Sequence, residues 1–267
     1  MIPTNNELTG MDERGRCWLS DQQWAAYFEQ ARQGKDRSIL FHEMVSAELA
    51  RCGPGATLLD IGCGRGIGGG RVLQESLAAA AGRFIGIEPD RDVAVSDCFC
   101  QVHRCTLEEA PLEAGSIDVA MAAFVLEHVA DPASFFRKLH EVLGRRGVFW
   151  AMTIDKRHPF ALLSNLAQRM WLKRPLLAWV RRGGPAENVE TYPTFYRSNT
   201  PRALARHAAA FGERRWLSLN YVGQHDAYLP QVLHRFAHAA DRMARSLRLP
   251  GPTAIVRLSK GTVQSTR

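Results

Sequence analysis

A glycine-rich stretch, Asp60-x-Gly62-x-Gly64-x-Gly66, contains the residues best suited to bind a ligand. An apolar run before it is expected to form a buried strand, and a helical pattern begins at Arg71. Glycine has no Cβ atom, so a loop of this composition lets a ligand approach the backbone N–H groups closely. A tight turn without a ligand is a second interpretation, although a turn needs far fewer glycines.

The spacing of these glycines matches two kinds of ligand. Gly64-x-Gly66-x-x-Gly69 fits the fingerprint of a dinucleotide-binding loop, whereas the longer series that starts at Asp60 fits a loop that binds S-adenosylmethionine. Asp60 favours the second ligand, because a carboxylate repels a pyrophosphate but attracts a sulfonium and an ammonium group. Glu88 ends the next predicted strand, and its carboxylate can accept two hydrogen bonds from the ribose of either ligand.

The composition indicates a globular protein in a reducing compartment. At 267 residues the chain suits one domain with additions or two small domains, and no apolar run reaches the length of a membrane span. The N-terminal residues lack the basic and apolar segments of a secretory signal. The six cysteines show no disulfide-scaffold rhythm, so we expect a cytoplasmic protein with free thiols.

One cysteine-rich segment contains residue types that bind metals, namely Cys98-x-Cys100-x-x-His103-x-Cys105. We predict no metal there. The segment falls on a predicted strand, in which neighbouring residues point to opposite faces, so the cysteines are interpreted as structural.

The elements that position the glycine loop lie at 53–154, where strand and helix patterns alternate. After Glu88 we expect a short helix, and Asp131 with Pro132 forms a typical N-cap pair for a longer one. This alternation predicts a parallel sheet with helices on both faces. Ahead of it, 1–52 should supply two helices whose apolar faces pack on the sheet. The expected helices are 21–33 and 37–51, and the later strands are 101–105, 116–124 and 148–153.

A series of short motifs follows the glycine loop in order. They are Ile87-Glu88-Pro89, Thr106 to Leu112, Ile117-Asp118-Val119, Phe124 to Val129, Asp131-Pro132 and Val142 to Gly147. Over about residues 40–155 the series resembles the class I S-adenosylmethionine-dependent methyltransferases of the small-molecule type. The resemblance implies an α/β fold: a seven-stranded, mostly parallel sheet with helices on both faces, plus helical lid insertions. It also implies S-adenosylmethionine as the cofactor.

The resemblance further implies roles for individual residues. Gly62 and Gly64 would pass along the methionine part of the cofactor, and Glu88 would hold the ribose. Phe124 would lie near the methyl group, and the family often has an aspartate beside the adenine where this chain has Thr106. The complete set of cofactor-binding candidates is Asp60, Gly62, Cys63, Gly64, Glu88, Pro89, Thr106, Leu107 and Phe124.

The second half departs from a minimal enzyme of this class through two insertions. Residues 155–199 are expected to form a helical and aromatic lid, and 200–267 to complete the core around a helix inserted at about 229–248. Basic residues and tryptophans concentrate at 160–182, which fits either an amphipathic element in contact with a membrane or the solvated face of a lid helix. Insertions near strand ends suit substrate binding. The substrate-binding candidates are His158, Tyr192, Tyr196 and His225.

We predict an enzyme that transfers a methyl group from S-adenosylmethionine to an O, N or C nucleophile on a small or lipid-linked acceptor. The net charge of +7 admits nucleic acid as a partner, but 122–125 lacks the Asn/Asp-Pro-Pro-aromatic signature of base N-methyltransferases. An NAD(P)-dependent oxidoreductase and a non-catalytic partner subunit of the same fold are the alternatives. The protein would be cytoplasmic or peripheral to the inner face of a membrane, and no pattern indicates its oligomeric state.

His128 is the candidate general base. It lies four residues beyond Phe124, near the expected position of the methyl group, and an imidazole can exchange a proton near neutral pH. A base is required only if the acceptor is a hydroxyl or an acidic carbon, since alignment supplies much of the acceleration in methyl transfer. The alternative is that Glu127-His128 is a structural turn.

Overall fold

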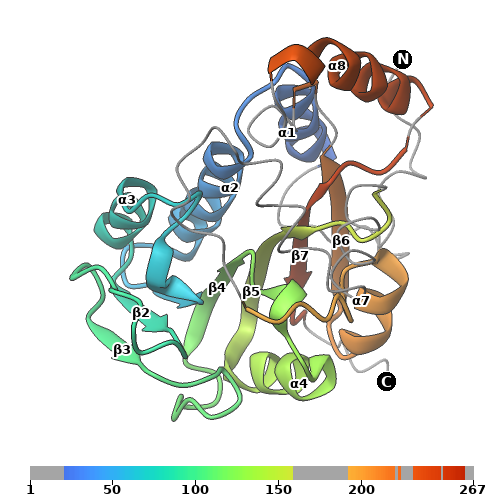
Figure 1. Cartoon of the computed structure of the whole chain (residues 1–267). Helices are drawn as coiled ribbons and strands as arrows, with labels where there is room; N and C mark the ends of the chain where they lie inside the picture. The colour runs from blue at the N-terminus through green and yellow to red at the C-terminus, as the bar shows by residue number, and fades with distance from the viewer. Residues whose placement is uncertain (1–20, 159–191, 220–221, 224–230, 248, 262–267) are drawn as a thin grey trace.

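The computed structural model describes residues 21–158, 192–219, 222–223, 231–247 and 249–261. Within these ranges the strands form a seven-stranded sheet of order β3-β2-β1-β4-β5-β7-β6 (Figure 1). β1 to β5 pair in parallel, and β7 pairs antiparallel with both β5 and β6. This confirms the predicted seven-stranded, mostly parallel sheet, whereas most of the predicted lid at 155–199 lies outside the described residues. The strands are β1 (Thr57–Ile61), β2 (Arg83–Ile87), β3 (Gln101–His103), β4 (Ile117–Ala123), β5 (Leu143–Ile154), β6 (Glu213–Leu219) and β7 (Thr253–Ser259).

Helices cover both faces of the sheet. Because side chains alternate along a strand, Leu58 joins the apolar cluster on one face while Leu59 joins the cluster on the other. Helices α1 and α2, with α3, pack on the first face, and α4 with α7 pack on the second. The helices are α1 (Asp21–Arg32), α2 (Arg37–Cys52), α3 (Val72–Ala80), α4 (Pro132–Val142), α7 (Pro201–His207) and α8 (Gln231–Ser246), with short 3₁₀ turns η2 (Cys63–Arg65) and η3 (Leu126–His128).

Side-chain caps fix where three of these helices begin. Asp131 accepts hydrogen bonds from the N–H groups of Ala133 and Ser134 at the start of α4, as the sequence predicted. Thr200 caps α7 in the same way, and Asp36 caps α2. The cap on α2 matters for function because it fixes the end of the helix that faces the cavity described below.

A buried network of charged groups ties α2 to the antiparallel part of the sheet. The carboxylate of Glu48 accepts from Arg257 Nε at 3.0 Å and from the indole N–H of Trp150 at 3.2 Å. Arg257 also donates to Glu213 at 2.7 Å. Removing one partner would leave a buried charge uncompensated, a change that typically costs about 3–5 kcal/mol. The network therefore anchors α2 firmly against β5, β6 and β7.

Two predicted details are wrong. No helix follows Glu88: Glu88 Oε1 accepts from the N–H of Asp90, and Asp90 Oδ1 accepts from the N–H of Asp92. These side chains occupy N–H groups that a helix would need, so the segment forms bends and turns instead. The fifth strand also begins earlier than the predicted residue 148: β5 starts at Leu143, directly after α4, and a register shift opposite Ile117 and Val119 absorbs the extra residues.

Candidate functional site

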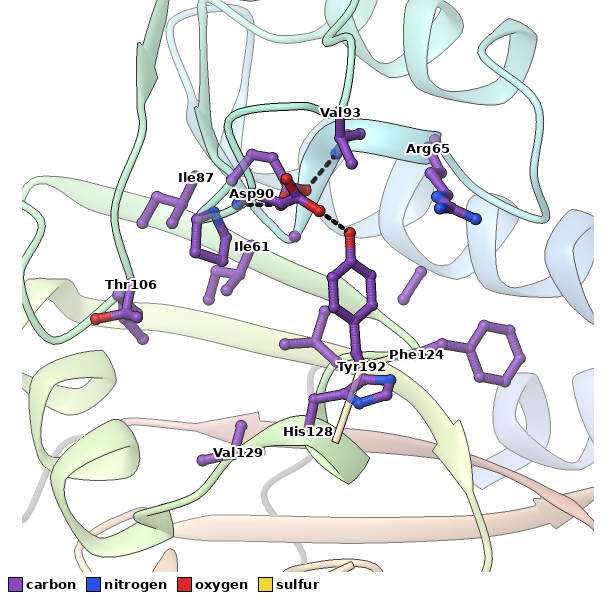
Figure 2. Close-up of a pocket in the computed structure, with 18 of the residues that line it drawn as sticks. Ile61, Arg65, Ile87, Asp90, Val93, Thr106, Phe124, His128, Val129 and Tyr192 are labelled. Atoms are coloured by element: carbon purple, nitrogen blue, oxygen red, sulfur yellow. Dashed lines mark hydrogen bonds between the residues drawn. The ribbon is translucent and has the colours of Figure 1, made fainter. Parts of the chain in front are cut away.

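A cavity of about 1320 Å³ opens at the carboxyl ends of β1, β2 and β4 (Figure 2). This is where parallel α/β sheets bind ligands. The walls come from the glycine loop, the start of α2, the segment after β2, the turn after β3, the end of β4 with η3, and the chain at 192–195. Lining residues discussed below are Arg37, Gly62, Gly64, Arg65, Glu88, Pro89, Asp90, Thr106, Leu107, Phe124, His128, Tyr192, Pro193 and Phe195.

The glycine loop follows β1 directly and is held against the end of β2. Gly62 has a positive φ of 74°, a conformation that glycine adopts without strain, and its N–H donates to the carbonyl of Ile87 at 2.7 Å. At Gly64, a Cβ atom would lie 2.3 Å from a methyl carbon of Val93 and 2.7 Å from Glu88 Oε2. Glycine is thus required at this position by Val93 and Glu88, which fill the space a side chain would need.

Glu88 is buried at the end of β2, and both of its carboxylate oxygens are engaged. Oε2 accepts from the N–H of Gly64 and Oε1 from the N–H of Asp90, each at 3.0 Å. A carboxylate has about four lone-pair sites, so Glu88 can still accept hydrogen bonds from a ligand in the cavity that it lines. Glu88 therefore links the glycine loop, the segment after β2 and the cavity.

Asp60 and Cys63 lie behind the loop and do not line the cavity, unlike the other cofactor-binding candidates. Asp60 is only 3% exposed and accepts from Gln74 Nε2 at 2.6 Å. Burial, together with the charge of Glu88, raises the pKa of Asp60 to about 7, against a lowering contribution from the Gln74 hydrogen bond. Burial likewise raises the pKa of the Cys63 thiol, which makes that thiol unreactive at neutral pH.

Phe124 stands where β4 enters the cavity, in a strained backbone conformation with a φ of 57°. Its N–H donates to the carbonyl of Met152 at 2.7 Å, which holds the strand end in place. The guanidinium of Arg37 lies 4.9 Å from the Phe124 ring centroid and donates to the Thr253 hydroxyl at 2.8 Å. Arg37 was not a sequence candidate; the Asp36 N-cap pattern directly before it was the available signal.

Residues 192–197, the strap, run along η3 and close one side of the cavity. The Tyr192 hydroxyl donates to the carboxylate of Asp90, and its ring meets the His128 ring edge-on with centroids 5.9 Å apart (Figure 2). His128 Nδ1 lies 2.8 Å from the carbonyl oxygen of Pro193. The N–H groups of Phe195 and Tyr196 both donate to the carbonyl of Glu127.

The Pro193 carbonyl selects one tautomer of His128. A carbonyl oxygen only accepts hydrogen bonds, so Nδ1 must carry the proton. In the neutral imidazole this leaves Nε2 as an acceptor. In its neutral form His128, which lines the cavity, therefore keeps one ring nitrogen that can accept a hydrogen bond.

The four substrate-binding candidates do not all line the cavity. Tyr192 lines the cavity beside His128, whereas Tyr196 is buried with a φ of 51° and does not line it. His158 is also buried away from the cavity, its N–H donating to the carbonyl of Asp155. His225 lies outside the described residues, as does 160–182. Besides Arg37, the lining residues that sequence reasoning missed include Arg65, Asp90 and Phe195.

Comparisons with known proteins identify the family. Residues 27–212 match the family described as a methyltransferase domain. The ubiquinone biosynthesis O-methyltransferase of Ruegeria pomeroyi is 32% identical over 187 residues, which is 63% of this chain and 72% of that protein. The protein of the same name from Azorhizobium caulinodans is 30% identical over 197 residues, covering 68% and 76% of the two chains.

A solved structure supports the same fold. Geranyl diphosphate C-methyltransferase from Streptomyces coelicolor superposes with a TM-score of 0.53 at 15% identity, covering 82% of this chain and 74% of that one. At this identity the likeness concerns the fold alone. The family match and the relatives support the methyltransferase interpretation over the oxidoreductase and the non-catalytic subunit. This chain belongs to the methyltransferase-domain family and is an S-adenosylmethionine-dependent methyltransferase of a small-molecule acceptor.

Proposed function

We propose that this enzyme methylates a hydroxyl group on an aromatic, lipid-linked acceptor. The observation that carries the proposal is the tautomer of His128, whose Nε2 is left as a proton acceptor on the cavity wall. A hydroxyl is a poor nucleophile until it loses its proton, so an O-methyltransferase benefits from a base in this position. Relatives named as ubiquinone biosynthesis O-methyltransferases support the same chemistry.

The residues around the cavity fit S-adenosylmethionine. The buried Glu88 carboxylate offers acceptors for a ribose, Thr106 and Leu107 offer an edge for the adenine, and the loop at Gly62 and Gly64 offers backbone without side chains. The Glu88 carboxylate suits a cationic cofactor better than a pyrophosphate. When bound, the cofactor supplies a methyl group already activated by its sulfonium.

The remaining work falls to the protein's own side chains. Phe124, Tyr192 and Phe195 supply an apolar and aromatic wall that excludes water and orients a flat acceptor ring. His128 accepts the hydroxyl proton at Nε2, while its Nδ1–H keeps donating to Pro193 and so fixes the plane of the imidazole. The side chains therefore need only to position the acceptor and to accept its hydroxyl proton.

The lipid-linked part of the proposal concerns where the enzyme works. We take 155–199 as a lid over the acceptor side and 160–182 as a segment that contacts a membrane, because its basic and aromatic residues suit an anionic surface. No helix in the described ranges is both long and apolar enough to cross a membrane. A cytoplasmic enzyme peripheral to the inner face of the membrane would meet a lipid-linked acceptor there.

Two measurements test the proposal. Calorimetric titration of the protein with S-adenosylmethionine, S-adenosylhomocysteine and NADH, repeated on Glu88→Ala, tests the cofactor site. Loss of about 1.5–3 kcal/mol of binding free energy in the variant fits an acceptor of ribose hydrogen bonds; unchanged affinity would assign the ribose to another residue. Assays with phenols and catechols bearing apolar tails, against matched anilines, test the acceptor. Methylation of the anilines alone would reject the hydroxyl acceptor.

A further inference from the structure

Helix α8 presents its apolar side to solvent. Val232, Phe236 and Met243 recur at helical spacing on one face and are 78%, 75% and 61% exposed. Leu247, one residue beyond the helix end, continues this face through its N–H bond to the Met243 carbonyl and is 62% exposed. A helix that packs on a globular core normally turns such a face inward. Figure 1 shows α8 at the periphery of the molecule, in orange-red at the top of the view.

The opposite side of α8 is the one that the protein buries. Asp241 follows Val232 by nine residues, which at about 100° per residue places it across the helix axis from the apolar face. Asp241 is only 4% exposed, and its carboxylate accepts from the N–H of Gly223 at 2.9 Å. The helix is therefore fixed in an orientation that directs its apolar face outward.

The charges beside this face select the kind of surface that it fits. Arg235 and Arg242 are exposed along one flank of the apolar residues, and the only acidic residue of α8 is the buried Asp241. Two copies of this chain, each with a net charge of +7, would repel one another, and an antiparallel pairing of α8 would bring these arginines together along one seam. An anionic lipid surface instead accepts the apolar face among its acyl chains and pairs the arginines with headgroups.

We propose that α8 is an interfacial helix that docks the enzyme on an anionic lipid surface. Val232, Phe236, Met243 and Leu247 enter the acyl boundary, and Arg235 with Arg242 lie at the headgroups. This surface is formed by described residues and does not depend on 160–182. It also does not depend on the identity of the acceptor, so the experiments on the hydroxyl acceptor and on His128 test the proposed reaction separately from this surface.

Vesicle sedimentation of the full chain tests the proposal. The probes are vesicles of phosphatidylcholine alone and vesicles containing phosphatidylglycerol, at low salt and at 0.5 M salt. We expect the native protein to bind the anionic vesicles and to be released by salt. Phe236→Glu with Met243→Glu is expected to raise the lipid concentration for half-maximal binding about tenfold or more. Arg235→Gln with Arg242→Gln is expected to remove most of the preference for phosphatidylglycerol.

Arg145→Gln with Arg146→Gln is the control, because these exposed arginines at the start of β5 lie outside α8 and their loss changes the net charge equally. It is expected to bind vesicles like the native protein. Circular dichroism and S-adenosylmethionine titration of every variant verify folding. A Phe236→Trp variant gives a second readout: brominated lipids should quench its added emission more than that of the native protein.

Several results would overturn the proposal. The native protein could fail to bind anionic vesicles, or Phe236→Glu with Met243→Glu could bind them as well as the native protein does, which would move the contact to another segment. A native dimer that this double variant converts to a monomer, without lipid binding by either, would assign the face to a second copy of the chain. Equal quenching of Phe236→Trp and the native protein would count against it too.

Discussion

The hydroxyl of Tyr192 donates a hydrogen bond to the carboxylate of Asp90, although 102 positions separate the two residues in the chain (Figure 2). Asp90 follows β2 just beyond the Glu88 carboxylate, and Tyr192 belongs to the strap that holds His128. Burial and this hydrogen bond raise the pKa of Tyr192 to about 12, and the same bond lowers the pKa of Asp90. The link therefore connects the proposed cofactor side of the cavity to the proposed base.

Tyr192→Phe removes this link and keeps the aromatic ring. We expect weaker binding of S-adenosylmethionine, by about three- to tenfold, because the strap no longer holds the cavity wall beside Asp90. The dissociation rate measured by stopped-flow fluorescence should account for most of the change, since Tyr192, Pro193 and Phe195 of the strap form one wall of the cavity. An unchanged dissociation rate would show that the strap does not control cofactor exchange.

Gly64→Ala tests whether the glycine loop works through Glu88. The added Cβ would lie 2.7 Å from Glu88 Oε2 and 2.3 Å from Val93, so the carboxylate must move. We expect the Kd of S-adenosylmethionine to rise about tenfold or more, measured by calorimetry. Gly70→Ala is the matched control: its φ is not positive and no heavy atom lies within 4 Å of the added Cβ, so its Kd should stay within about twofold of the native value. An equal rise in the Kd of S-adenosylmethionine in both variants would argue against this role for Glu88.

Features of the fold that depend on local residue patterns could be predicted from the sequence. Alternating strand and helix signals yielded the parallel sheet, and the cap residue Asp131 marked the start of α4. The sequence could not reveal which loop residues face the cavity, because that depends on packing between distant segments. Asp60 belongs to the motif yet lies behind the loop, while Asp90 belongs to no motif and reaches Tyr192 across the cavity. The bends after Glu88 were missed because side-chain acceptors, which periodicity does not register, compete with the helix.

Asp60 makes the stability of the protein depend on pH. Its carboxyl loses its proton near pH 3.8 in a model peptide and near pH 7 in the folded protein, where it is buried. Between these values the folded state holds the extra proton, so Asp60 makes the free energy of unfolding fall as pH rises from about 4 to about 7. Asp60→Asn cannot titrate and keeps an oxygen that can accept from Gln74. Relative to the native protein, its free energy of unfolding should rise across this window by an amount on the order of 3 kcal/mol.

Urea unfolding of both proteins at pH 5, 6, 7 and 8 measures this difference. Asp131→Asn is a useful control, because hydrogen bonds from Ser134 lower the pKa of Asp131 and its own contribution is lost only at more acidic pH. The difference in the free energy of unfolding between Asp131→Asn and the native protein should therefore stay constant from pH 5 to pH 8. Parallel curves for Asp60→Asn and the native protein would mean that Asp60 is already ionised in the fold.

Once an acceptor has been identified, His128→Ala and His128→Gln test whether His128 is the general base. Nδ1 donates to the Pro193 carbonyl, which leaves Nε2 to accept a hydroxyl proton, and neither variant has an atom that can do this near neutral pH. We expect kcat at saturating S-adenosylmethionine to fall about 10²-fold or more in both variants, with the Kd of the cofactor unchanged. Glutamine can still donate to Pro193, so it separates loss of the base from loss of the strap contact. If His128→Gln retained most of the native kcat while His128→Ala did not, His128 would be a positioning residue for the strap. A loss of only a few-fold in both variants would leave proximity and orientation as the source of the acceleration.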